Sequence, residues 1–146
     1  MYPRFLSDVD ITCDQLQFQE ALMNIMMNAV ESMELNGGIV TIRLIKVMKD
    51  IVIEIEDTGC GIPSDIRSRV FEPFFTTRST LNNHGLGLSY SYNVIEKHGG
   101  SMEIHSEVNV GTKVLIRFPH HRIVHIQKLD KGRVGNSHEH DKGIAG

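Results

Sequence analysis

The sequence predicts an α+β domain, in which helices cover one face of a mixed, mostly antiparallel sheet to form a two-layer α/β sandwich. Two segments have the apolar period of helices, and each precedes a pair of β-branched segments that are separated by a tight turn. This order places both long helices on the same side of the sheet, facing each other across a groove. We expect the domain to span residues 1–119 and residues 120–146 to form a flexible tail or the start of a linker.

Composition restricts the function before any motif is considered. The 146 residues carry a formal net charge of −3 and are 40% hydrophobic, which is ordinary for a globular protein and disfavours a nucleic-acid binder. No apolar run reaches the roughly 18 residues of a membrane span, and the acidic start does not resemble a signal peptide. Cys13 and Cys60 form no metal-binding pair, so a reducing cytoplasm is the expected location.

The first long helix is predicted over residues 15–35, after Asp14 as its N-cap, and Gly37-Gly38 is expected to end it. Its apolar residues recur at helical spacing and define one face. This face comprises Phe18, Leu22, Ile25, Met26, Ala29, Val30 and Met33. A hairpin follows, in which Lys49-Asp50 separates residues 39–48 from residues 51–57. In the second strand, the isoleucines point to one side of the sheet and Glu54 and Glu56 to the other.

The middle of the chain is predicted to contain a glycine turn, a short helix and a long loop. The turn is DTGCGIP (57–63), and Ser64 or Asp65 is expected to cap a short helix that ends near Phe71. The loop over residues 71–85 is typical of a lid, although its Phe rings are equally suited to core packing.

The second long helix is predicted over residues 86–98 and is ended by Gly99-Gly100. Strands over residues 101–106 and 112–118 then form a second hairpin. A short edge strand is expected within residues 3–12.

Asn24 and Asn28 lie one turn apart on the first helix, on a polar stripe that includes Glu20. Asn is a poor residue for the middle of a helix, so the pair has a cost of roughly 1 kcal/mol without a packing reason. A solvated polar face is one interpretation. The other is a pair of amide oxygens, which are hard ligands suited to Mg²⁺.

Glycines open the second long helix, in HGLGL (84–88), where free N–H groups and the positive end of the helix dipole favour a phosphate group. A flexible hinge is the alternative. The pattern is neither a Rossmann fingerprint nor a P-loop, because no strand runs into GxGxxG and no GK[ST] follows.

Taken together, these segments resemble the ATP-binding catalytic domain of sensor histidine kinases, in the Bergerat-fold family that includes DNA gyrase B, Hsp90 and MutL. QEALMNIMMNAVESM is similar to the N box, DTGCGIP to the G1 box, FEPFFTT to the F box and HGLGLS to the G2 box. The resemblance covers roughly residues 4–119. At positions 31 and 32, where one branch has Lys and an aromatic residue, this chain has Glu31 and Ser32.

The resemblance implies roles for individual residues. Asn28 would coordinate Mg²⁺ on the ATP phosphates, Asn24 would support the metal or the γ-phosphate, and Asp57 would bind the adenine amine. Glu20 is a candidate to orient the phosphate-accepting histidine, and Arg78 is a candidate to neutralise phosphate charge. The other nucleotide-binding positions that the resemblance implies are Gly59, Gly61, Ile62, Phe74, Thr77, His84, Gly85, Leu86, Gly87, Leu88 and Thr112.

The resemblance also implies a reaction. Relatives that hydrolyse ATP place a Glu general base one turn before the metal-binding Asn, and Asn24 cannot accept a proton. We therefore expect transfer of the γ-phosphoryl group of Mg-ATP to a histidine. The alternatives are an ATP-binding switch module without transferase activity, or a related serine kinase or ATPase.

The chain contains no H box, so the accepting histidine is expected on a separate dimerisation domain, in the same larger protein or in trans. The chain is then either a fragment or a stand-alone module. A response regulator would be served indirectly, and neither nucleic acid nor direct membrane contact is expected. Five histidines in the tail lack a carboxylate or Cys scaffold, so no metal site is expected there.

Overall fold

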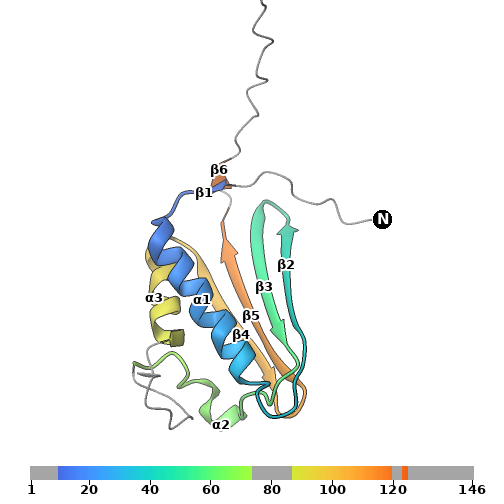
Figure 1. Cartoon of the computed structure of the whole chain (residues 1–146). Helices are drawn as coiled ribbons and strands as arrows, with labels where there is room; N and C mark the ends of the chain where they lie inside the picture. Colours follow the sequence, from blue (N-terminus) through green and yellow to red (C-terminus); the bar gives the residue numbers. More distant parts are fainter. Residues whose placement is uncertain (1–9, 74–86, 120–122, 125–146) are drawn as a thin grey trace, which may run out of the picture.

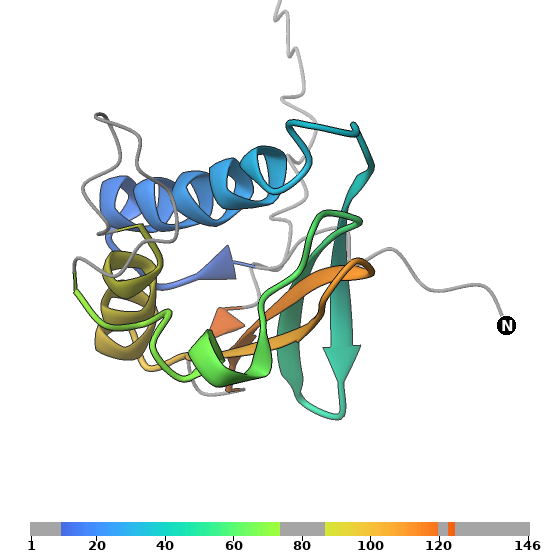
Figure 2. The same ribbon diagram turned by 90° about the horizontal axis from the view of Figure 1, so that it is seen from below.

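The sheet of this protein has four strands, and both long helices lie on one of its faces (Figures 1 and 2). The computed structural model describes residues 10–73, 87–119 and 123–124. In spatial order the strands are β2 (Val40–Val47), β3 (Asp50–Asp57), β5 (Gly111–Phe118) and β4 (Ser101–Glu107). The predicted two-layer α/β sandwich is confirmed. The prediction of a mixed sheet is corrected, because every pairing in this described sheet is antiparallel.

A separate two-stranded sheet pairs β1 (Asp10–Ile11) with β6 (Ile123–Val124). β1 falls within the segment that was expected to contain an edge strand. β6 falls within the predicted tail, of which the structure describes only these two residues. The domain boundary at residue 119 remains a prediction.

α1 (Gln15–Glu31) begins as predicted and ends earlier. The Asp14 carboxylate accepts a hydrogen bond from the Gln17 N–H at 3.0 Å, as an N-cap does. After Glu31 the amides of Met33 and Glu34 bond to carbonyls three residues back, so the helix gives way to tight turns. The expected end at residue 35 is therefore wrong, and Gly37, with φ +67°, ends the turns that follow the helix.

α3 (Gly87–Lys97) ends where the glycine pair predicts. Gly99 has φ +79°, its N–H bonds to the Glu96 carbonyl at 3.0 Å, and the Gly100 N–H bonds to the Ile95 carbonyl at 2.9 Å. These two bonds form a Schellman motif.

α2 (Ser64–Arg67) is a single turn. Its N-cap is Pro63, so the prediction that Ser64 or Asp65 caps it is wrong: Ser64 is already helical, and no side chain caps the helix. The first hairpin is also corrected, because Asp50 belongs to β3 and Met48, with φ +57°, lies in the turn.

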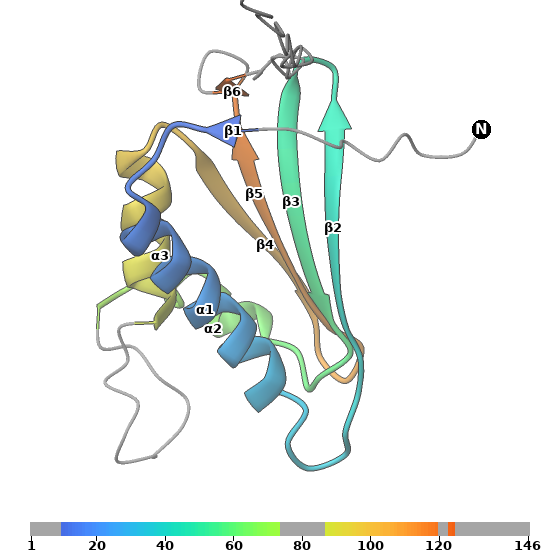
Figure 3. The same cartoon turned by 45° about the horizontal axis from the view of Figure 1, so that its top comes forward.

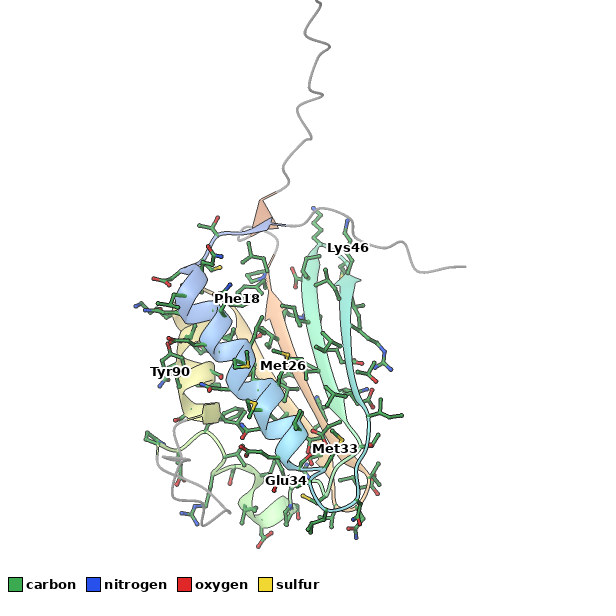
Figure 4. The ribbon with its side chains drawn as sticks, viewed as in Figure 1. Phe18, Met26, Met33, Glu34, Lys46 and Tyr90 are labelled. Carbon is green, nitrogen blue, oxygen red and sulfur yellow. The ribbon has the colours of Figure 1, made fainter. Side chains whose placement is uncertain are left out.

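The core lies between the two helices and the inner face of β3, β5 and β4. Ile25, Ile95 and Ile116 are fully buried there. Phe18 points from α1 toward the sheet (Figure 4), and its ring meets Phe118 edge-on with centroids 5.7 Å apart. The predicted alternation in β3 is confirmed, because its isoleucines face this core and its glutamates face outward.

The helices do not reach across the whole sheet. β2 lies at the edge away from them (Figure 3), and its inward-facing residues Ile42 and Leu44 are 56% and 48% exposed. Val30 was predicted on the apolar face of α1 and is 52% exposed. The inner face of the sheet is therefore shielded from solvent under α1 and α3 and exposed to solvent at β2.

Charges organise the outer face of the sheet. Glu54 is only 9% exposed, although it is ionisable. Arg43 donates to Glu54 and, at 2.7 Å, to Glu56, while the Lys113 ammonium lies 3.7 and 3.8 Å from the same two carboxylates. The network links β2, β3 and β5. The Arg43 guanidinium lowers the pKa of the Glu56 carboxyl, with help from Lys113.

We predict that truncating Ile116 destabilises the fold much more than truncating Ile42. Ile116→Ala leaves a cavity in a core that is fully buried, so the free energy of unfolding should fall by roughly 2–5 kcal/mol. Ile42→Ala removes the same atoms from an exposed strand and should cost about 1 kcal/mol or less. Urea denaturation followed by circular dichroism measures both. Equal losses would show that β2 is covered in solution.

We also predict that the Glu56 carboxylate stabilises the fold at pH values above its ordinary pKa of 4.5, and that this stabilisation is lost in acid. Because its folded pKa is lowered, the stabilisation is complete above the unfolded value and disappears as the pH falls through the folded value. Glu56→Gln should therefore lower the unfolding temperature at pH 7 and have little effect at pH 3. Glu34→Gln, at an exposed residue in the turn after α1, is the control. A difference between wild type and Glu56→Gln that grows in acid would contradict the assignment.

Candidate functional site

A cavity of about 490 Å³ lies between the C-terminal half of α1, the ends of β3 and β5, α2 and the start of α3. Its walls are mainly apolar, with a few polar groups at defined places. The lining residues are Ile25, Asn28, Ala29, Glu31, Ser32, Ile55, Asp57, Cys60, Gly61, Ile62, Pro63, Ile66, Val70, Gly87, Leu88, Ile104, Val108, Asn109, Thr112 and Val114.

Asp57 provides the buried charge of the cavity. It is the last residue of β3 and only 6% exposed. Its Oδ1 accepts hydrogen bonds from the Gly59 N–H at 2.9 Å and from the Ser32 hydroxyl at 3.0 Å. Both of these donors bond to the same oxygen. Oδ2 is therefore the atom of Asp57 that is left to accept a hydrogen bond from a ligand.

The glycine turn can approach its neighbours only because its two glycines lack side chains. A Cβ on Gly59 would lie 2.0 Å from the Ser32 Oγ, and a Cβ on Gly61, whose φ is +71°, would lie 2.1 Å from the Glu107 carbonyl oxygen. Both positions therefore exclude other residues. The turn is held down further by the Ile62 N–H, which donates to the Ser106 hydroxyl at 2.7 Å.

Thr112 lies opposite Asp57 in the register of β3 and β5. Its hydroxyl is 2.8 Å from the Ser106 hydroxyl, which also contacts the glycine turn. Ser106 thus links the turn to the wall beside Asp57. Ser106 could not be identified from the sequence, because a serine in an alternating strand gives no local signal.

Asn28 and the start of α3 meet at the other end of the cavity. A Cβ on Gly87 would lie 3.5 Å from the Asn28 Nδ2 and 3.9 Å from the Asn24 Cβ. The first turn of α3 contains no acidic residue that would offset the positive end of the helix dipole. An amide side chain and a helix N-terminus that lie together suit an anionic group.

Glu20 and Asn24 do not line the cavity. Tyr90 projects from α3 toward α1 (Figure 4), and its hydroxyl donates to the Glu20 carboxylate at 2.6 Å, which raises the pKa of Tyr90. The buried Ser91 hydroxyl adds a bond to the Ala21 carbonyl at 2.8 Å. These two bonds fix α3 against α1. Tyr90 and Ser91 were not predicted to make these contacts, because each lies 70 residues from the group that it bonds to.

Seven of the predicted site residues share the cavity wall: Asn28, Asp57, Gly61, Ile62, Gly87, Leu88 and Thr112. Gly59 is not among the lining residues, but its N–H donates to the Asp57 carboxylate. Six others, Phe74, Thr77, Arg78, His84, Gly85 and Leu86, lie outside the described residues. Ser32 was missed as a site residue. Its position one turn after Asn28, on the same helix face, was the signal that could have identified it.

Within the described part of the chain, no group of three or more His, Cys, Asp or Glu residues could hold a metal ion. The five tail histidines lie outside it. The Asn28 amide oxygen is suited to be the single protein ligand of a Mg²⁺ ion, because Mg²⁺ takes few protein ligands when phosphates supply the remaining ligands. Both cysteines are free. Among the described helices, none has the length and apolar character needed to cross a bilayer.

This geometry suits a ligand with two different ends. A buried carboxylate oxygen at one end accepts from an amine, and apolar walls from Ile25, Ile55 and Val114 fit a flat ring. The amide and helix terminus at the other end suit an anion. An adenine nucleotide has these features in this order.

Comparison with known proteins agrees with this geometry. The family model described as "Histidine kinase-, DNA gyrase B-, and HSP90-like ATPase" matches residues 13–122. The chain is 34% identical over 139 residues to Sensor kinase CckA of Brucella abortus, and 38% identical over 109 residues to Sporulation kinase A of Bacillus subtilis. The alignments cover 85% and 75% of this chain but only 14% and 18% of those relatives. The chain thus spans less than a fifth of their length.

Solved structures give the same picture. The mycobacterial sensor histidine kinase MprB matches with a TM-score of 0.67 and 31% identity, over 75% of this chain and 76% of that chain. Full-length ShkA in complex with AMPPNP matches with a TM-score of 0.64 and 26% identity, over 80% of this chain and 23% of that chain.

Proposed function

The chain belongs to the histidine kinase-, DNA gyrase B- and HSP90-like ATPase family, and on this premise we propose that it is the ATP-binding catalytic domain of a two-component sensor histidine kinase. In this proposal it transfers the γ-phosphoryl group of ATP to a histidine on a separate dimerisation domain. The observation that carries the proposal is one continuous cavity that joins the buried Asp57 acceptor to the Asn28 amide at the start of α3.

Asp57 binds the base. Its carboxylate can only accept, and adenine presents an amine as a donor. The wall beside it is formed by Gly61, Ile62 and Thr112. The Gly59 N–H orients the carboxylate by donating a hydrogen bond to it. AMPPNP bound to full-length ShkA supports an adenine nucleotide as the ligand of this fold.

Asn28, Gly87 and Leu88 bind the phosphate end. The Asn28 amide oxygen would provide one metal ligand, and the first amides of α3 would donate to the phosphates. Mg²⁺, when bound, would neutralise charge on the phosphate oxygens. We further propose that Phe74, Thr77, Arg78, His84, Gly85 and Leu86 complete the site.

Asn24 favours transfer over hydrolysis, since an amide cannot remove a proton from water. Glu20, two turns before Asn28, already accepts a hydrogen bond from Tyr90. We propose that Glu20 and Tyr90 contact the histidine that accepts the phosphoryl group. A neutral histidine is nucleophilic by itself, so these residues have only to position it and stabilise charge.

We propose that the accepting histidine belongs to a dimerisation domain of a larger protein, because the relatives named above are several times longer than this chain. A response regulator would receive the phosphoryl group from that histidine. The cytoplasm, where ATP is available, is the proposed location.

The test mixes the full chain with radiolabelled Mg-ATP and its partner dimerisation domain. We expect acid-labile, base-stable phosphoprotein. Binding of ATP without any label would favour a switch module, and steady release of phosphate from the chain alone would favour an ATPase. Either outcome would contradict the proposal.

We predict that Asn28→Ala lowers phosphoryl transfer on the order of 100-fold. Its binding of adenosine, which lacks phosphates, should change less than twofold. Met27→Ala, at a 49% exposed residue beside Asn28 on α1, is the matched control and should transfer normally. Equal losses of transfer and of adenosine binding in Asn28→Ala would remove Asn28 from the phosphate end.

We predict that Asp57→Asn weakens ADP binding roughly tenfold or more, because the amide places a donor where one of the present contacts needs an acceptor. Asp50→Asn changes the first residue of the same strand, β3, and should leave binding intact. Isothermal titration calorimetry measures both. An unchanged affinity in Asp57→Asn would exclude Asp57 as the base-reading residue.

A further inference from the structure

We propose that Ser32 is a positioning residue for Asp57, and that it thereby sets the preference of the site for a base with a 6-amino group. The inference rests on the proposed nucleotide-binding function. It concerns a residue whose hydroxyl touches the carboxylate that is proposed to bind the base.

Ser32 is held firmly in place by its main chain. Its N–H bonds to the Asn28 carbonyl at 3.0 Å, and its carbonyl accepts from the Cys60 N–H at 3.2 Å. One residue therefore joins the end of α1 to the glycine turn. Because Gly59 has no Cβ, the Ser32 hydroxyl can lie against the turn and reach the carboxylate.

The hydroxyl is the second donor to Asp57. The Ser32 Oγ lies 2.7 Å from the Ala29 carbonyl and 3.0 Å from the Asp57 Oδ1, and its single hydrogen can be donated to either acceptor. An ionised carboxylate is the stronger acceptor of the two. The hydroxyl and the Gly59 N–H approach the same oxygen. Together they fix the rotation of the carboxylate, which a single donor would leave free.

Fixing Oδ1 in this way determines what Oδ2 can bind. Oδ2 becomes a pure acceptor in a set direction within the cavity. Adenine presents an amine at C6, whereas guanine presents a carbonyl oxygen, which would face the carboxylate as a second acceptor. Without Ser32 the carboxylate can turn, and the advantage of the amine should shrink.

The test compares ADP with purine riboside 5′-diphosphate, which has hydrogen in place of the 6-amino group. In Ser32→Ala, we expect the Kd for ADP to rise about tenfold, because a hydrogen bond to a charged group is lost. The Kd for the analogue should stay within twofold of wild type. A residue with a merely structural role would weaken both nucleotides alike.

Ser32→Cys keeps the size of the side chain and has a weaker donor, so it should show an intermediate loss for ADP only. If circular dichroism shows that Ser32→Ala does not fold, the Kd values of Ser32→Cys are compared with those of the wild type in its place. Ser101→Ala, at an exposed serine of β4, should leave both Kd values unchanged.

The outcomes separate the two proposals. Equal weakening of both nucleotides, or no weakening of either, would overturn the role of Ser32 while the proposed function stands. If the wild-type chain binds neither nucleotide, the proposed function fails, and this is visible before any variant is made.

Discussion

The buried carboxylate at the end of β3 is the constraint on which one end of this molecule depends. A charge that is 94% removed from solvent needs donors at short range. Gly59 provides one from the chain two residues later, and Ser32 provides the other from the end of α1. The glycines of the turn, the early end of the helix and the place of α1 over the sheet all satisfy this requirement.

The same helix also connects the two ends of the cavity. Asn28 and Ser32 are one turn apart on one face of α1. Asn28 lies beside the start of α3, and Ser32 bonds to Asp57. Their separation is fixed by helix geometry, at about 6 Å of rise for four residues. The buried Ser91 bond and the Tyr90–Glu20 bond fix α3 against the same helix. The distance between the base end and the phosphate end of the cavity is thus set by α1, which is a rigid element.

Much of this arrangement could be predicted from the sequence, because local rules act at the decisive positions. Asp14 as N-cap, Gly99-Gly100 as helix end and the alternation of β3 follow from short-range chemistry, and the structure confirms them. The end of α1 could not be predicted, since it depends on tight turns that position Ser32 beside Asp57. The exposure of Ile42 depends on how far the helices reach, which alternation alone does not encode.

The pairing of β1 with β6 has a mechanical consequence. Asp10 lies opposite Val124, so the described fold is entered and left through neighbouring residues. This pair lies at the end of the molecule away from α2 and the cavity (Figure 1). A force that either flanking segment transmits therefore acts on the domain at this one place.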